Sequence, residues 1–165
     1  MKCAIDFAST DFNDPRISAA CRVLRASHVV GMASIIREIA LNVAAELVWL
    51  RLRDVGSVAT KLAPGIVEES SFEDGIRCVT FVSGLKIEEL IVSIDDSARR
   101  MVYAVQGRAR HHQASMQVIG EGLNNCRFVW ITDVLPDEAA SRFACMMDQA
   151  LPVIKVTLES DAHRT

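Results

Sequence analysis

The stretch CRFVWITDVLPDEAASRFACMMDQALPVIKVTLES, Cys126 to Ser160, decides the fold. A strand that carries Trp130 ends near Leu135-Pro136, and one long amphipathic helix follows it. Proline is favoured in the first turn of a helix, and the acidic residues after it complement the helix dipole. The apolar side chains of this helix recur on one face: Ala139, Phe143, Met146, Met147, Ala150, Ile154 and Leu158. A long helix that comes after many strands has to bury such a face against the sheet, and a sheet that curves around it leaves a pocket.

Pro152 lies inside the helical pattern. Proline removes one hydrogen bond of the helix and its ring clashes with the preceding turn, so we expect a kink at this position. A kink would bend the helix along the sheet and leave space on one side, which makes the helix the lid of a cavity.

Strand-like segments at short spacing precede the helix. They are Gly65 to Phe72, Ile76 to Val82, Leu85 to Ile94, Arg99 to Val105, Arg110 to Ile119 and Asn125 to Val134. Turn-forming residues such as Glu73-Asp74-Gly75 separate them, and connections this short join only antiparallel neighbours. The segment Ile35 to Val43 also alternates, which gives an α+β fold with a seven-stranded antiparallel sheet.

Two short helices are predicted directly after the first strand. They span Ala44 to Arg53 and Val55 to Leu62, with Leu47, Val48 and Leu52 expected on one apolar face. Pro64-Gly65 ends the second helix.

The length of 165 residues suits one domain. Residues 1–31 show little periodicity, so they form either an N-terminal extension, which we expect to be disordered or loosely packed, or a segment upstream of the true start. We expect the domain to span residues 32–160 and a short tail to span 161–165.

Composition excludes several classes of protein. The net charge of −3 lacks the basic excess of a nucleic-acid-binding protein. No apolar run approaches the roughly 18 residues that a membrane-spanning helix requires. The five cysteines, Cys3, Cys21, Cys78, Cys126 and Cys145, form no CxxC pair, so reduced thiols and a cytoplasmic location are expected. We expect no cofactor and no metal, since the adjacent His111 and His112 point to opposite faces of a strand and cannot readily chelate one ion.

Five local patterns, taken in order, resemble one known superfamily. They are Ala45-Glu46-Leu47-Val48-Trp49, Arg53-Asp54-Val55-Gly56, Arg77 with Gly84 and Glu89, Asp95-Asp96-Ser97-Ala98-Arg99-Arg100-Met101-Val102-Tyr103, and Cys126-Arg127-Phe128-Val129-Trp130. Between about Ala33 and Leu158 the chain is similar to the polyketide cyclase/dehydrase-like branch of the START-related (SRPBCC) superfamily, which includes the birch pollen allergen. The resemblance implies a helix-grip fold, in which the sheet curves around the C-terminal helix. It does not imply one reaction, because that superfamily includes lipid carriers, hormone receptors and cyclases.

Strand alternation predicts which side chains face the pocket. The expected ligand-binding residues are Arg77, Val79, Phe81, Glu89, Tyr103, His112, Met116, Phe128, Trp130, Phe143 and Met147. Arg77 and Glu89 either pair across a hairpin or bind ligand. His112 is a core histidine, a ligand contact or a proton-transfer residue. Tyr103 and Trp130 either fill the core or anchor a ligand.

These features favour a protein that binds or transports a hydrophobic small molecule of the lipid, polyketide or isoprenoid type. An alternative is a metal-free enzyme of the cyclase, aromatase or dehydratase kind, with His112, Glu89 and Tyr103 as candidate catalytic residues. A third hypothesis is a protein-interaction adaptor that uses the outward-facing Val129 and Ile131, in a monomer or a homodimer.

Overall fold

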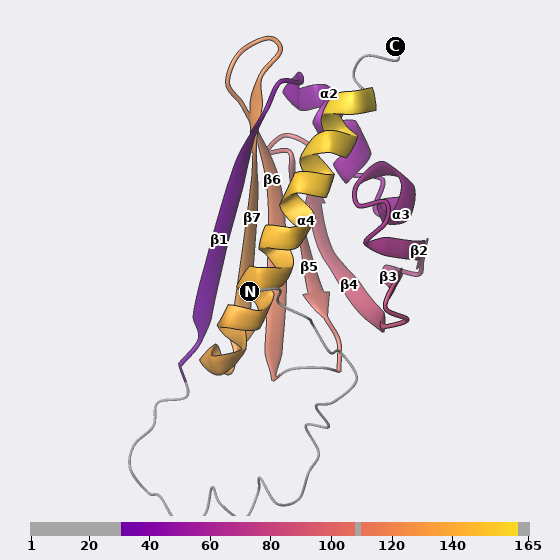
Figure 1. Ribbon diagram of the computed structural model, residues 1–165, viewed down its shortest axis with the longest axis vertical. Coiled ribbons are helices and arrows are strands. Elements are labelled where there is room, and N and C mark those ends of the chain that lie inside the picture. Colours follow the sequence, from indigo (N-terminus) through magenta and orange to yellow (C-terminus); the bar gives the residue numbers. More distant parts are fainter. Residues whose placement is uncertain (1–30, 108–109, 162–165) are drawn as a thin grey trace, which may run out of the picture.

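Seven antiparallel strands form one sheet, and a long helix lies across one of its faces (Figure 1). The computed structural model describes residues 31–107 and 110–161. The strands are β1 (Ala33–Leu41), β2 (Val67–Glu73), β3 (Ile76–Phe81), β4 (Lys86–Asp95), β5 (Arg100–Val105), β6 (His111–Gly120) and β7 (Cys126–Leu135). Their order in the sheet is β1-β7-β6-β5-β4-β3-β2, so β1 and β2 are the edges. The sequence prediction of a seven-stranded antiparallel sheet is confirmed.

Tight turns set the register of the meander from β2 to β7. Asp74 and Gly75 both have positive φ, 49° and 82°, which is the backbone that a two-residue hairpin turn requires. In the rest of the meander, Arg77 of β3 lies opposite Glu89 of β4, and Met116 of β6 lies opposite Trp130 of β7. These pairs are on the inner face, as strand alternation predicts.

Helices α2 (Ala45–Leu52) and α3 (Val58–Lys61) follow β1. The prediction that Leu47 lies on the apolar face of α2 is wrong, because its side chain is 40% exposed. The buried positions are Ala45, Val48, Trp49 and Leu52, at the i, i+3, i+4, i+7 spacing of one helical face. Leu47 lies outside that face, and Trp49 is buried beside Val48 and Leu52 in its place.

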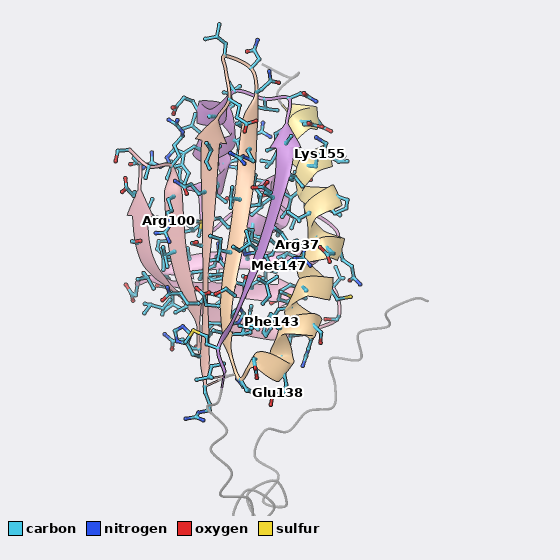
Figure 2. The ribbon with its side chains drawn as sticks, turned by 90° about the vertical axis from the view of Figure 1, so that its left-hand side faces the viewer. Arg37, Arg100, Glu138, Phe143, Met147 and Lys155 are labelled. Carbon is cyan, nitrogen blue, oxygen red and sulfur yellow. The ribbon has the colours of Figure 1, made fainter. Side chains whose placement is uncertain are left out.

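The long helix begins as a 3₁₀ turn, η1 (Asp137–Ala139), and continues as α4 (Ala140–Asp161). Pro152 is exposed within it, and α4 remains one continuous helix through this residue. Figure 2 shows α4 as a separate layer beside the sheet, with Phe143 and Met147 on the side that faces the strands. The kink at Pro152 remains a prediction.

Polar contacts attach α4 to the edge strand β1 (Figure 2). The Nε of Arg37 lies 2.6 Å from Oδ1 of Asp148, and Nζ of Lys155 donates to the carbonyl oxygen of Ala40 at 2.5 Å. They hold one flank of the helix against β1, so any space under the helix lies toward the strands on its other flank.

The outer face of the sheet carries Val129 and Ile131, which are both half-buried. Their predicted role in self-association stays a prediction. Of the helices in residues 31–107 and 110–161, none is both long and apolar enough to span a membrane. The predicted segments 1–31 and 161–165 lie almost entirely outside the described residues.

Candidate functional site

A cavity of about 540 Å³ lies between α4 and the inner face of the sheet. Strands β3 to β7 provide one wall, and α4 provides the other through Phe143, Met146, Ala150 and Ile154. A third side comes from α3 and the loop after it, through Val58, Leu62, Ala63 and Ile66. This size lies within the range of small-molecule sites, and most of the lining is apolar.

A buried ion pair lies in the wall of this cavity. The Nε of Arg77 donates to Oε2 of Glu89 at 2.5 Å, and the two residues are 3% and 5% exposed. They face each other across β3 and β4, which is the first of the two alternatives that the sequence leaves open for them. Burial raises the pKa of the Glu89 carboxyl, and the adjacent guanidinium of Arg77 opposes this shift. The cavity wall therefore contains a neutralised pair and not a free charge.

Tyr103 lies beside this pair on β5. The guanidinium carbon of Arg77 is 4.7 Å from the centre of the Tyr103 ring, in a cation–π contact. Burial raises the pKa of the Tyr103 phenol far above its ordinary value, and the negative charge of Glu89 adds to the shift. The phenol is thus protonated at any ordinary pH, and it can act as a hydrogen-bond donor.

His112 reaches the cavity from β6. Its ring contacts the ring of Phe143 on α4, with 4.3 Å between centroids and a tilt of 56°. Burial lowers the pKa of His112 to about 4, and the nearby His111 contributes to the shift. The imidazole is neutral at pH 7, so it can accept a proton but cannot serve as a cationic acid.

Trp130 contributes an unsatisfied polar atom. Its side chain lines the cavity and is 7% exposed, and its buried Nε1 has no hydrogen-bond acceptor among the residues that the structure describes. The oxygen of the Tyr103 phenol is the nearby candidate acceptor, and a hydrogen bond from the Trp130 indole lowers the pKa of that phenol against the larger effect of burial. By distance and angle, however, Nε1 meets no acceptor among the described residues, so a better-placed acceptor can replace the phenol oxygen.

Nine of the eleven predicted ligand-binding residues border the cavity: Arg77, Val79, Phe81, Glu89, Tyr103, His112, Met116, Trp130 and Phe143. Phe128 and Met147 do not, and both are fully buried in the packed core. Phe128 has the predicted inward orientation, but it lies near the beginning of β7, where side chains fill the space. Met147 is on the flank of α4 next to the residues that face the cavity.

Sequence reasoning missed several cavity residues. Thr132 of β7 is not among the predicted site residues, although strand alternation puts it on the same face as Trp130, and it is almost completely buried at the cavity wall. Met146, Ala150 and Ile154 belonged to the predicted apolar stripe, which was the available signal. The contribution of α3 had no signal, because a four-residue helix has no periodicity that could place it.

The side chains that bind metal ions are scattered in the described part of the chain. Among residues 31–107 and 110–161, no three His, Cys, Asp or Glu side chains come together in a way that could hold an ion. The chemistry that the cavity offers is therefore that of apolar contact, neutral hydrogen-bond donors, one neutral imidazole and one internal ion pair.

Comparison with solved structures establishes the helix-grip fold. An uncharacterised protein from Bacillus thuringiensis superimposes with a TM-score of 0.70 at 18% identity, over 76% of this chain and 98% of that one. Norcoclaurine synthase from Thalictrum flavum, in complex with dopamine and hydroxybenzaldehyde, gives a TM-score of 0.65 at 16% identity, over 81% and 88% of the two chains. The Zhui aromatase/cyclase from Streptomyces sp. R1128 gives 0.59 at 17% identity, over 81% and 95%.

No family model and no curated protein matches the sequence. At these identities the structural likeness shows the fold alone, and it confirms the helix-grip fold that the sequence patterns imply.

Proposed function

We propose that this protein binds a hydrophobic small molecule of the lipid, polyketide or isoprenoid type in the cavity between α4 and the sheet, and transports it. The observation that supports this function is the cavity itself, with its volume of about 540 Å³ and its largely apolar lining. Residues that pack only to stabilise a fold leave few voids larger than a water molecule, so a space of this size is more typical of a ligand site. The solved relatives in fold include norcoclaurine synthase bound to two small aromatic molecules.

Native mass spectrometry of freshly purified protein tests this proposal. We expect a species heavier than the polypeptide, which loses the extra mass under denaturing conditions because the ligand is not covalently bound. Protein that is empty is then titrated with apolar probes such as dodecane and 2-dodecanone. A protein that carries nothing and binds neither probe contradicts the proposal.

A second candidate function is a metal-free enzyme of the cyclase or aromatase kind. It is favoured by one observation, which is that His112, Tyr103 and Glu89 all border the same cavity. A neutral imidazole could remove a proton from a bound chain, and the phenol could donate a hydrogen bond to the developing oxyanion. Once a substrate is known, His112→Gln and Glu89→Gln should each reduce turnover, and unchanged turnover in both variants excludes these roles.

We further propose that the protein acts in the cytoplasm as a monomer or a homodimer. Within the described residues, Cys78, Cys126 and Cys145 form no disulfide bond with one another, as expected of a protein in a reducing compartment. Size-exclusion chromatography of the wild type and of Val129→Lys separates the two oligomeric states. A dimer that elutes unchanged in the variant does not use this part of the outer sheet face.

A further inference from the structure

The two tryptophans of the chain differ in how their indole N–H groups are satisfied. Both side chains are buried, but Nε1 of Trp49 donates to Oδ1 of Asp96 at 2.9 Å, whereas Nε1 of Trp130 has no acceptor in the part of the chain that the structure describes. Buried polar groups are nearly always hydrogen-bonded, because loss of contact with water costs free energy that only a new partner restores. Because Trp130 borders the cavity, a molecule bound there is placed to provide an acceptor for this N–H.

A second donor lies next to this one. Tyr103 of β5 is opposite Ala114 of β6, and Ala114 is opposite Thr132 of β7, two residues from Trp130. This register brings the phenol and the indole to the same part of the inner face, where a hydrogen bond from the indole lowers the pKa of the phenol. One oxygen atom at this point of the cavity could accept hydrogen bonds from the indole and from the phenol.

The charges around this point favour a neutral ligand. Arg77 is the cation nearest to Tyr103 on the cavity wall, and it is already paired with the buried carboxylate of Glu89. His112 carries no charge at pH 7, since burial lowers its pKa to about 4. Arg142 also borders the cavity, but its side chain is exposed, so water screens its charge. A carboxylate at the two donors would be desolvated without a free cation to compensate it.

From these contacts we propose that the ligand is a neutral molecule with an oxygen acceptor, of the ketone, ester or quinone class, and that the indole N–H of Trp130 donates a hydrogen bond to this oxygen. The inference rests on the proposed binding function and adds the chemical class of the ligand and the residue that selects it. Trp130 is thus a specificity-determining residue, and the apolar lining provides the remaining contact.

Three probes of equal chain length test the inference: dodecane, 2-dodecanone and dodecanoate at pH 7. Dissociation constants are measured for the wild type, for Trp130→Phe and for Trp49→Phe. Phenylalanine keeps an aromatic ring in the cavity and removes the N–H, and circular dichroism checks that each variant is folded. The three probes differ in how readily they leave water. For each probe this contribution is the same with every variant, so it cancels when the dissociation constants of wild type and variant are compared.

We expect Trp130→Phe to weaken the binding of 2-dodecanone about three- to tenfold more than the binding of dodecane. This is the range for loss of one hydrogen bond. Trp49→Phe, the matched control, should leave the ratio of the two affinities unchanged. We also expect dodecanoate to bind the wild type more weakly than 2-dodecanone. In a ¹H–¹⁵N correlation spectrum of the wild type, the Trp130 indole signal, assigned from the two variants, should move with 2-dodecanone more than with dodecane.

The outcomes distinguish this inference from the function on which it rests. If none of the three probes binds the wild type, the proposed function fails and the inference fails with it. If the probes bind but Trp130→Phe weakens the binding of 2-dodecanone and of dodecane equally, only the inference fails. The same holds if the indole signal moves equally with both probes. Tighter binding of dodecanoate than of 2-dodecanone would overturn the preference for a neutral ligand.

Discussion

The paired side chains of Arg77 and Glu89 show how a charge is accommodated within an apolar cavity wall. Each ion would be costly to bury alone, and the contact of 2.5 Å offsets much of that cost without making the pair strongly stabilising. The Tyr103 ring covers one face of the guanidinium. The pair therefore leaves the cavity neutral overall while providing polar surface at a defined place.

Removal of one partner tests this interpretation. Glu89→Leu leaves the guanidinium of Arg77 buried without a counter-charge, and we expect the free energy of unfolding to fall by about 3–5 kcal/mol. The double variant Arg77→Met, Glu89→Leu should recover most of this loss, because no charge remains buried. Urea denaturation followed by circular dichroism measures both. As a control, Glu38→Leu breaks the exposed pair with Arg127 and should cost less than about 1 kcal/mol. Equal losses in the single and double variants would contradict the argument.

The neutral imidazole of His112 predicts a dependence of stability on pH. Its pKa in the folded protein is about 4, below the ordinary value of 6.5, so the unfolded chain binds the extra proton first as the pH falls. The contribution of the neutral imidazole to stability is therefore fully present above pH 6.5 and is lost as the pH falls toward 4. Between pH 7 and pH 5, linkage gives a loss of about 2 kcal/mol from this residue. We expect the wild type to lose that much more stability than His112→Gln over the same interval, measured by urea denaturation. Parallel curves for the two proteins would show that His112 is not held neutral.

At the scale of the elements, the sequence patterns that resemble the START-related superfamily include residues that connect α2 to the turn between β4 and β5. Nε1 of Trp49 donates to Asp96, and the guanidinium of Arg53 lies 3.1 Å from the same carboxylate. The Nη1 of Arg99 donates to Oε1 of Glu46 at 2.7 Å. These motif residues therefore position a helix on a hairpin and do not line the cavity. Other residues of the same patterns do line it: Arg77, Glu89, Tyr103 and Trp130. The patterns thus combine structural contacts with cavity wall.

Asp96 provides the test of this connection. Asp96→Ala leaves the buried indole N–H of Trp49 without an acceptor, so we expect a loss of about 1–3 kcal/mol in the free energy of unfolding. Asp96→Asn retains a carbonyl oxygen for the indole and should lose less. Thermal and urea denaturation measure the difference between the two variants. If asparagine is as destabilising as alanine, the ion pair with Arg53 and not the indole contact is the main interaction.

The sequence predicts the direction of side chains within each strand, but it does not predict where the cavity ends and the packed core begins. Strand alternation correctly places Arg77, His112 and Trp130 on the inner face, because side-chain direction in a strand is a local property. Alternation could not separate the cavity wall from the packed core, and Phe128 shows why, since it shares the inner face with Trp130 but lies where the space is filled. That separation depends on the path of α4 over the sheet, which local sequence does not determine.

For the whole molecule, the balance between packing and empty space is the property that relates fold to function. A polar attachment holds α4 against β1 through Arg37 and Asp148, while the other flank of the helix stands over the cavity. The sheet and helix could have closed on each other with larger side chains. Instead, a small residue, Ala150 of α4, is present where the helix faces the cavity.

Filling this space should separate binding from stability. Ala150→Phe directs a ring into the cavity, so we expect at least a tenfold loss of affinity for 2-dodecanone. Its free energy of unfolding should be unchanged or slightly higher, because the ring occupies space that is already open and gains apolar contact. The matched control is Ala45→Phe, at a buried alanine of α2 that is not part of the cavity lining. There the added ring has no space, and overpacking should cost about 1–3 kcal/mol without a direct effect on the cavity. Calorimetric titration and urea denaturation of both variants measure the two quantities. If Ala150→Phe is as destabilising as Ala45→Phe, the space under α4 is not available to a ligand, and the helix serves only to close the core.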